Sequence, residues 1–435
     1  MHSGGRTSSR LFSIKAVCKV HMRIAYIVMQ FPSPTETFAG SDVRALRRAG
    51  LQVNVFAMRP RHPEHDQMLR ERDLVDVDVQ PLTLRGFVEG LALMFSNPRW
   101  TATLLGWVVR WHAFRPGDLL RCVLLVPSAL RITASIGRGR FDVVHLFWGH
   151  FPAMVGLLLQ RYFPDVVVSM FLGAYDLGDG RDGRFLPGSR VVAQRADLVW
   201  THSRSNLPRL RSLGVPDARL RCVHRGIDFT KFPSGAEARA REAGTVVAIG
   251  SLIERKAVGD VLRTIARVRS AVPHVRLKIL GDGPDRAALQ SLASSLEISD
   301  VMSFEGHVDS DTVSAELRRA SALILMSRED RLPNVVKEAM ASSCPCVVTH
   351  TQGMDELVIH ERTGYLVGIG DVEAAATYLT SILLEPELHA HVVDAARDHV
   401  VQAFSADASM AAYARHWRGV LKAREPSPAE IRLEA

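Results

Sequence analysis

The chain has 435 residues, of which 47% are hydrophobic and 23% are charged. This composition is typical of a globular protein rather than a disordered chain, and the length suffices for two or three domains with cores of their own. The five cysteines are scattered and odd in number. This usage predicts a reducing compartment, with neither a disulfide framework nor a metal site built on paired cysteines.

The net charge of +8 is unevenly distributed along the chain. Residues 1–230 contain 31 Lys and Arg against 18 Asp and Glu, whereas the remainder contains 23 against 28. A basic half joined to a mildly acidic half predicts that one half meets an anionic partner or surface. A solvated, arginine-rich surface explains the same counts, so both interpretations stay open.

Residues 1–21 are basic and rich in serine but lack a sustained apolar core, so we expect a disordered extension rather than a secretory signal. No stretch reaches the roughly 18 uninterrupted apolar residues that a membrane span needs. A helix is predicted at Gly40–Ala49, ended by Gly50. The strands predicted in the first half are Arg23–Met29, Gln52–Ala57, Asp142–Phe147, Val166–Phe171 and Leu198–Thr201.

Residues 84–137 predict a helical insertion between these strands. Its apolar residues include Trp100, Trp107 and Trp111, and they are mixed with arginines such as Arg85 and Arg110. One interpretation is a platform for a membrane surface or a lipid acceptor. The other is a helical part of the core of the first domain.

The second half alternates strands with helices. The strands are predicted at Thr245–Leu252, Arg276–Leu280, Ala322–Met326, Cys346–Thr349 and Tyr365–Val367, and the helices at Ala257–Arg269, from Asp285, and at Pro333–Ser343. This alternation predicts βαβ units and mostly parallel sheets covered on both faces.

We therefore expect an α/β protein with two domains. The first spans 22–228, the polar segment 229–244 is a linker, the second domain spans 245–420, and a tail follows at 421–435. Ligands of open α/β sheets bind beyond the carboxyl ends of the strands, which predicts a cleft between the two domains.

The segment Ser327–Met340 carries the strongest chemical signal. A strand leads into a turn that contains Glu329 and Asp330, and Pro333 fits the first position of the following helix. The free N–H groups and the positive dipole end of that helix form a seat for a phosphate or a polar sugar. Carboxylates in the turn can accept from sugar hydroxyls, and Glu338 in the second helical turn can hold a ribose. Capping of the helix dipole is the alternative role for Glu338.

The stretch DRLPNVVKEAMASSCPCVV resembles the signature of glycosyltransferase family 4, in which two glutamates are separated by seven residues. Glu338 matches the second glutamate. Asp330 falls on the first, one methylene shorter, and Glu329 beside it is an alternative for the same role. The resemblance covers about 22–420 and is strongest from 245 to 370.

Other family features follow in order. Gly250–Lys256 resembles the stretch that grips the donor diphosphate with an Arg and a Lys: Lys256 matches the Lys, Ser251 replaces the Arg, and Arg255 is a neighbouring charge. The segments around Gly281 and Gly306 resemble those that border the base and the ribose. The resemblance also implies donor contacts for Asn334 and Val335 at the start of the signature helix.

In the first half, Phe31–Phe38 followed by Gly40 resembles the family's loop after the first strand, which implies an acceptor-side role for Thr37 and Gly40. Asp142–His150 places two histidines near a strand end that faces the cleft. His145 and His150 are therefore candidates for the reaction centre, although a lone histidine is often structural. Asp176, in the motif LGAYD, belongs to another cleft-facing loop.

The resemblance implies a GT-B fold of two Rossmann-like domains and a retaining transfer from a nucleotide sugar, such as a UDP- or GDP-sugar. It implies neither a bound metal nor a tightly bound cofactor, and no nucleic acid partner is expected. We expect a saccharide or lipid-linked acceptor in cell-surface glycan synthesis, in the cytoplasm or at the inner face of the membrane. A sugar-nucleotide epimerase and a non-catalytic protein that binds a sugar nucleotide or a glycan are the alternatives.

Overall fold

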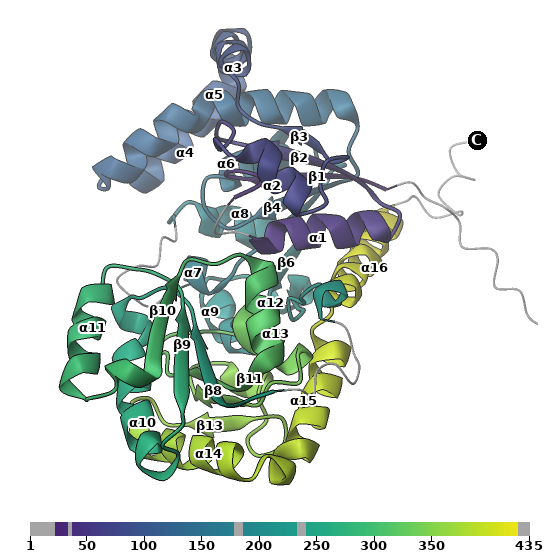
Figure 1. The fold of residues 1–435 in the computed structure, drawn as a ribbon. Helices are drawn as coiled ribbons and strands as arrows, with labels where there is room; N and C mark the ends of the chain where they lie inside the picture. Colours follow the sequence, from purple (N-terminus) through teal and green to yellow (C-terminus); the bar gives the residue numbers. More distant parts are fainter. Residues whose placement is uncertain (1–21, 34–36, 178–185, 233–240, 425–435) are drawn as a thin grey trace, which may run out of the picture.

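The computed structural model describes residues 22–33, 37–177, 186–232 and 241–424. The expected extension 1–21 lies outside these ranges, as do residues 233–240, half of the expected linker, and residues 425–435. Two α/β units are stacked along the long axis of the molecule (Figure 1). The expected two-domain α/β architecture is confirmed.

The first described sheet is seven-stranded and entirely parallel, in the order β3-β2-β1-β4-β5-β6-β7. Its strands are β1 (Arg23–Val28), β2 (Gln52–Ala57), β3 (Asp78–Gln80), β4 (Val143–Phe147), β5 (Val167–Phe171), β6 (Leu198–Thr201) and β7 (Leu220–Cys222). Every residue of β4 and β5 is buried. This is the pattern of central parallel strands with helices on both faces.

The second described sheet is six-stranded and also parallel, in the order β10-β9-β8-β11-β12-β13. Its strands are β8 (Glu242–Ile249), β9 (Arg276–Leu280), β10 (Met302–Gly306), β11 (Ala320–Leu325), β12 (Cys346–Thr349) and β13 (Tyr365–Val367). In each sheet the chain reverses its direction of progress once, between β1 and β4 and between β8 and β11. Such switch points leave a crevice at the carboxyl edge of the sheet.

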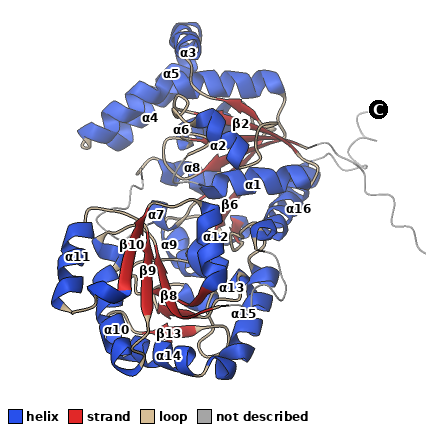
Figure 2. Ribbon diagram, viewed as in Figure 1, coloured by secondary structure: helices blue, strands red, loops and turns tan. Residues whose placement is uncertain are grey.

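Helices cover both faces of each sheet (Figure 2). In the first half they are α1 (Thr37–Arg48), α2 (His65–Glu71), α3 (Leu84–Ser96), α4 (Pro98–His112), α5 (Pro116–Gly139), α6 (Ala153–Tyr162), α7 (Ala174–Leu177), α8 (Ser189–Arg195) and α9 (Leu207–Ser212). In the second half they are α10 (Val258–Ala271), α11 (Arg286–Ser295), α12 (Ser310–Arg319), α13 (Asn334–Ala341), α14 (Val372–Leu384), α15 (Ala390–Ala403) and α16 (Ala406–Arg424).

The expected helical insertion consists of α3, α4 and α5. Local sequence explains its helix starts: Thr83 Oγ1 accepts from Gly86 N at 3.0 Å, and Pro98 and Pro116 occupy first helical positions. The inner face of α5 belongs to the core of the first domain, where Val126 and Leu130 are buried. By length and composition α5 is the one described helix that could cross a membrane, yet 61% of that window is buried inside the fold.

The C-terminal end of the chain returns to the first domain. Gly226 allows the backbones 226–228 and 404–406 to cross, because a Cβ at this position would lie 2.0 Å from the carbonyl carbon of Ser405. Ile227 N donates to Phe404 O at 2.9 Å, and Ala406 N donates to Ile227 O at 3.1 Å. Beyond this crossing α16 lies along α1 (Figure 1).

This return corrects the expected second domain of 245–420. Trp417 of α16 is fully buried beneath the first sheet, where its Nε1 donates to Ser169 Oγ at 2.9 Å. Its core partners there include Trp200 and Tyr413. Helix α16 therefore completes the core of the first domain, and it continues to Arg424, into the expected tail. No local sequence pattern indicates that α16 belongs to the first domain, because Ser169, the hydrogen-bond partner of Trp417, is 248 residues away in sequence.

We expect Trp417→Ala to lower the free energy of unfolding of the first domain by about 3–5 kcal/mol, because it leaves a large cavity and removes a buried hydrogen bond. Urea denaturation followed by far-UV circular dichroism and tryptophan fluorescence measures this change. Arg418→Ala, on the exposed side of α16, is the matched control and should change stability by less than about 0.5 kcal/mol. Equal effects of the two substitutions would contradict the placement of α16.

Candidate active site between the two sheets

The loops at the carboxyl ends of the two sheets meet each other. Arg331, which follows β11, donates to Asn206 Oδ1 at 2.9 Å, and Asn206 follows β6. Glu356, which follows β12, bonds to residues that follow β6 and β7. The candidate active site is therefore assembled from loops of both domains at their switch points.

On the second domain, the loops after β8, β9 and β10 are joined by backbone hydrogen bonds. Gly250 N donates to Leu280 O at 3.0 Å, and Gly281 N donates to Gly306 O at 2.8 Å. Gly281 has φ +149°, and a Cβ there would lie 2.0 Å from Gly250 O. Only glycine fits this contact. Gly281 and Gly306 thus allow the loops after β8, β9 and β10 to approach each other closely at the carboxyl edge of the sheet.

Lys256 and Asp330 form the central ion pair of this crevice. The Lys256 Nζ lies 2.6 Å from Asp330 Oδ2, and the two side chains are only 16% and 14% exposed. Lys256 follows β8 and Asp330 follows β11, so the pair joins the two strands that flank the switch point. The backbone reinforces the contact, since Arg328 N donates to Arg255 O at 2.8 Å. A lysine near the start of a helix is a feature of anion-binding sites, and Asp330 lies in the turn that leads into α13.

Their predicted neighbours are distributed around this pair. Ser251, Arg255 and Glu329 are exposed on the same two loops. Ser251 and Lys256 also line a small hollow at the ends of β8 and β11. The structure therefore distinguishes the two carboxylates of the turn: Asp330 is bound to the lysine, whereas Glu329 faces solvent.

The signature helix α13 begins one residue later than expected. Pro333 is the extended residue before the helix, with ψ 138°, and Asn334 is the first helical residue. Leu332 before it is buried and has φ +51°, so the chain turns sharply into the helix. Asn334 and Val335 are half-buried at the helix start, and Glu338 is half-buried one turn later. The turn that carries Asp330 thus leads directly into the N-terminus of α13.

On the first domain, His150 and Asp176 lie together at the ends of β4 and β5. His150 Nδ1 lies 3.3 Å from Asp176 Oδ1, which also accepts from Gly149 N at 2.8 Å. Asp176 Oδ2 accepts from Gly173 N at 3.0 Å. Burial raises the pKa of Asp176 to about 7 despite these two backbone hydrogen bonds. Asp176 therefore connects the two loops and positions the imidazole of His150.

The expected catalytic role of His145 is not supported. His145 is 2% exposed and packs against Tyr413 and Trp417 beneath the sheet, away from the cleft. Ser169 Oγ accepts from the indoles of Trp200 and Trp417, so its hydroxyl donates to His145 Nδ1 at 3.0 Å. Burial and the charge of Arg225 lower the pKa of His145 to about 3. Alternation along β4 turns this side chain to the α16 face.

The remaining acceptor-side candidates lie on α1. Thr37 is its first residue, and nothing further is described for this side chain. Gly40 is buried against Leu74, whose Cδ1 would lie 3.1 Å from an added Cβ. Gly40 therefore has a packing role at this position.

Sequence reasoning missed a buried charged cluster between the domains. The Arg225 guanidinium lies over the rings of Phe38, Phe147 and Phe171, and its Nη2 is 3.2 Å from Asp42 Oδ2. Lys337 of α13, 2% exposed, donates to Arg225 O at 2.9 Å and to Asn334 Oδ1 at 3.1 Å. Burial and the charge of Arg225 lower the pKa of Lys337 to about 7. In the sequence, only the position of Lys337 directly before Glu338 could have drawn attention to this cluster.

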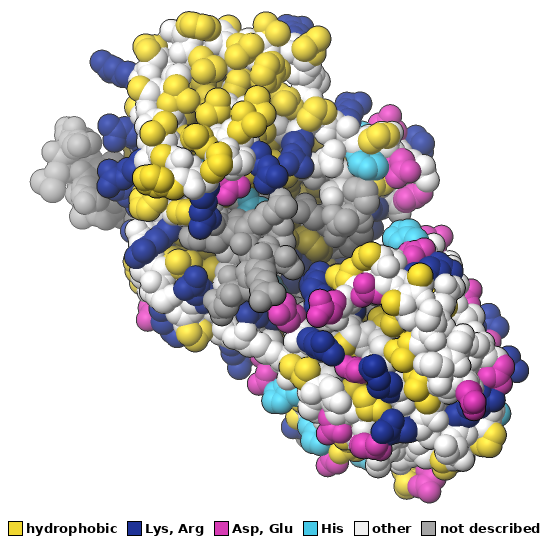
Figure 3. Space-filling view, turned by 90° about the vertical axis from the view of Figure 1, so that its left-hand side faces the viewer, with side chains coloured by type: hydrophobic (Ala, Val, Ile, Leu, Met, Phe, Trp, Pro, Cys, Tyr) yellow, Lys and Arg dark blue, Asp and Glu magenta, His cyan; other side chains and the backbone are white. Residues whose placement is uncertain are grey.

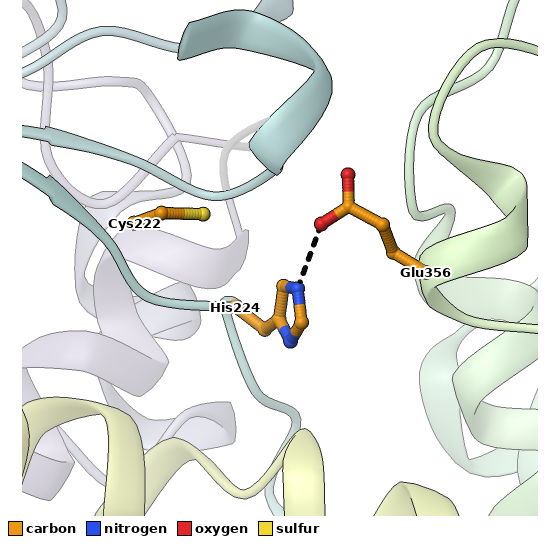
Figure 4. Close-up of side chains that lie close together, drawn as sticks. All are labelled: Cys222, His224 and Glu356. Atoms are coloured by element: carbon orange, nitrogen blue, oxygen red, sulfur yellow. Dashed lines mark hydrogen bonds and ion pairs between the residues drawn. The ribbon is translucent and has the colours of Figure 1, made fainter.

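Glu356 connects the two domains through several hydrogen bonds, of which Figure 4 shows the one with His224. Its carboxylate accepts from Ser203 Oγ, Arg204 N, Ser205 N and His224 Nε2, all of which belong to the first domain. Burial opposes ionisation, but these donors hold the pKa of Glu356 below its usual value.

Cys222, His224 and Glu356 form the one group of three metal-ligand types found among the described residues. Burial raises the pKa of the Cys222 thiol to about 11. The carboxylate oxygens of Glu356 are already engaged by N–H and O–H donors. The chemistry of this group therefore fits an interdomain contact better than a metal centre.

Comparison with known proteins agrees with this architecture. Residues 35–226 match the family described as glycosyl transferase 4-like domain, and residues 234–399 match glycosyl transferases group 1. The putative colanic acid biosynthesis glycosyltransferase WcaL of Salmonella typhimurium is 24% identical over 402 residues, which cover 89% of this chain and 97% of WcaL.

Two solved structures share the fold. Sucrose-phosphate synthase from Thermosynechococcus elongatus superposes with a TM-score of 0.68 at 18% sequence identity. The superposition covers 92% of this chain and 100% of the synthase chain. Anabaena HepE in complex with UDP gives a TM-score of 0.67 at 14% identity, with the same coverage. Together with the two family matches, which between them span most of the chain, these findings show that the protein belongs to the family 4 glycosyltransferases and has their GT-B fold.

Proposed function

We propose that this enzyme transfers a sugar from a nucleotide-sugar donor to a saccharide or lipid-linked saccharide acceptor, with retention at the anomeric carbon. The observation that carries the proposal is the Lys256–Asp330 pair, in which Asp330 lies in the turn that leads into α13. A UDP- or GDP-sugar presents two phosphates, a ribose and a hexose, and this crevice offers a cation, helix N–H groups and carboxylates to match.

In the proposed reaction the bond between the anomeric carbon and the diphosphate oxygen breaks, and negative charge develops on the leaving diphosphate. Lys256 and the N–H groups at Asn334 and Val335 stabilise that charge. The acceptor hydroxyl forms the new bond on the same face of the sugar, and its proton passes to an oxygen of the leaving diphosphate. Electrostatic stabilisation and positioning then provide the rate enhancement.

The carboxylates have separate roles in this proposal. Glu338 holds the ribose hydroxyls from the second turn of α13. Asp330 is bound to Lys256, so it orients the lysine and meets the sugar from the floor of the crevice, whereas the exposed Glu329 meets it from the rim. His150, positioned by Asp176, approaches the reaction centre from the opposite domain.

We place the enzyme in cell-surface glycan synthesis, in the cytoplasm or at the inner face of the membrane. The name of the Salmonella relative, a putative colanic acid biosynthesis enzyme, supports this assignment. A lipid-linked acceptor would be presented at a membrane surface, and the basic first half is the acceptor-side domain.

Donor binding tests the proposal directly. Isothermal titration calorimetry across UDP-, GDP- and ADP-sugars should identify one nucleotide class that binds, and the same donor should be hydrolysed slowly without an acceptor. Binding of none would overturn the proposal. Epimerisation of the sugar without an acceptor would favour an epimerase, and binding without any turnover would favour a non-catalytic protein.

Lys256→Gln is expected to lower kcat/KM by about 10²–10³-fold, because the leaving diphosphate loses its principal cation. Steady-state kinetics with the identified donor measures this loss. Lys422→Gln on the exposed side of α16 is a matched control with the same chemical change and should leave kcat/KM unaltered. Activity of Lys256→Gln within two-fold of the native enzyme would remove Lys256 from the site.

Glu338→Ala should weaken binding of the free nucleoside diphosphate by about 10–100-fold, as expected when hydrogen bonds to a charged group are lost. Glu329→Gln should leave nucleotide affinity unchanged, because we place this residue at the sugar and not at the ribose. Calorimetry with the nucleotide alone distinguishes the two. Unchanged nucleotide affinity in Glu338→Ala would contradict the proposed ribose contact.

The pH profile tests the pair of His150 and Asp176. The pKa of Asp176 is raised to about 7, so its carboxylate is ionised above that pH and protonated below it. Ionised Asp176 lies 3.3 Å from His150 Nδ1 and interacts more favourably with the imidazole than the neutral acid does, so kcat/KM should rise through about pH 7. Asp176→Asn should abolish this limb while near-UV circular dichroism confirms the fold. The same limb in Asp176→Asn would assign the titration to another group.

A further inference from the structure

One face of α3 is apolar and exposed along its whole length. Leu84, Val88, Leu91 and Phe95 recur at spacings of four, three and four residues, which places them on one side of the helix. Leu84 is 82% exposed and Phe95 is 86% exposed. The opposite side of α3 packs tightly on α5, where a Cβ at Gly90 would lie 2.2 Å from Pro127 O.

The apolar surface continues over the rest of the insertion. Phe114, between α4 and α5, is 99% exposed. Further exposed apolar residues on α4 and α5 are Val109, Leu120, Val123 and Leu124. Figure 3 shows hydrophobic side chains gathered over this end of the first domain, with basic side chains around them. We name the surface formed by Phe114 and these exposed apolar residues of α3, α4 and α5 the α3–α5 face.

The charges around the α3–α5 face are mainly positive. The segment 84–125 contains five arginines against one glutamate and one aspartate. The arginines Arg85, Arg99, Arg110, Arg115 and Arg121 are all exposed. Arg85 pairs with Glu89, and Arg121 lies 3.8 Å from Asp118, so a net charge of +3 remains on a surface that is otherwise apolar.

We infer that the α3–α5 face docks on the anionic surface of a lipid bilayer, with Phe95 and Phe114 entering the interface and the arginines contacting lipid phosphates. Apolar residues within a basic rim are the pattern of interfacial membrane binding. Large exposed apolar patches are otherwise rare on monomeric proteins. The inner faces of α3 and α5 are buried in the fold, so the insertion lies on the membrane without crossing it.

A second copy of this chain is the less favourable occupant. A two-fold interface would place the same face of two copies together and would therefore bring the two arginine rims into proximity. A bilayer containing anionic lipid covers the apolar residues and neutralises the rim at once. This inference rests on the proposed function in one respect, since it identifies the membrane at which a lipid-linked acceptor would be met.

Vesicle sedimentation tests the inference with the full-length protein. The native protein should pellet with vesicles of phosphatidylcholine that contain about 30% phosphatidylglycerol, much less with phosphatidylcholine alone, and less as salt is added. Phe95→Glu with Phe114→Glu should lower the partition coefficient at least about ten-fold. Arg110→Gln with Arg115→Gln should lower it in anionic vesicles only. Leu384→Glu with Leu388→Glu changes two other exposed apolar residues, in the second domain, and should have no effect.

Two results would overturn the inference. One is vesicle binding that neither the phenylalanine nor the arginine substitutions reduce. The other is a dimer, seen by analytical ultracentrifugation without lipid, that the phenylalanine substitutions dissociate while native vesicle binding is absent. Calorimetry of donor binding on the same preparations separates this from the proposed function. If the native protein binds donor but not vesicles, only the docking inference is contradicted. If it binds vesicles but no donor, only the proposed function is contradicted.

Discussion

The carboxylate of Glu356 accepts four hydrogen bonds from the first domain, and this contact orients the two parallel sheets toward each other. Parallel sheets place all their functional loops at one edge, so a site between two such sheets requires both carboxyl edges to face one another. The crossing of 226–228 with 404–406 adds a second connection between the domains. These contacts hold the loops at the two carboxyl edges against each other.

Within that arrangement, each wall contributes a charged pair. Lys256 and Asp330 join adjacent strands of the second sheet, and Asp176 beside His150 joins adjacent strands of the first. Both pairs are largely shielded from solvent. Electrostatic interactions are stronger in such an environment than in water. The buried Lys337 of α13 contacts the first domain through Arg225 O. The site therefore depends on charges that the fold keeps partly desolvated.

The insertion α3–α5 gives the first domain an exposed apolar surface that is separate from the candidate active site. Its inner residues complete the core, and its outer residues form an apolar face with a basic rim. Both interpretations of 84–137 at the sequence level are thus compatible, because one amphipathic layer has two sides. The proposed transfer site depends on electrostatic preorganisation. The proposed membrane contact depends on burial of apolar side chains in the bilayer interface.

Local patterns in the sequence determined the central strands, the two-domain α/β architecture and the segment Ser327–Met340, because side-chain periodicity and turn residues act over short distances. Lys256 and Glu338, the proposed donor-side residues, stand out for the same reason, since each lies in a contiguous motif. Only the tertiary structure decided that α16 belongs to the first domain, that His145 is a core residue and that Asp330 rather than Glu329 holds the lysine. These outcomes depend on contacts between residues tens to hundreds of positions apart, and no local pattern encodes which of two adjacent carboxylates, or which of two nearby histidines, the fold turns toward the cleft.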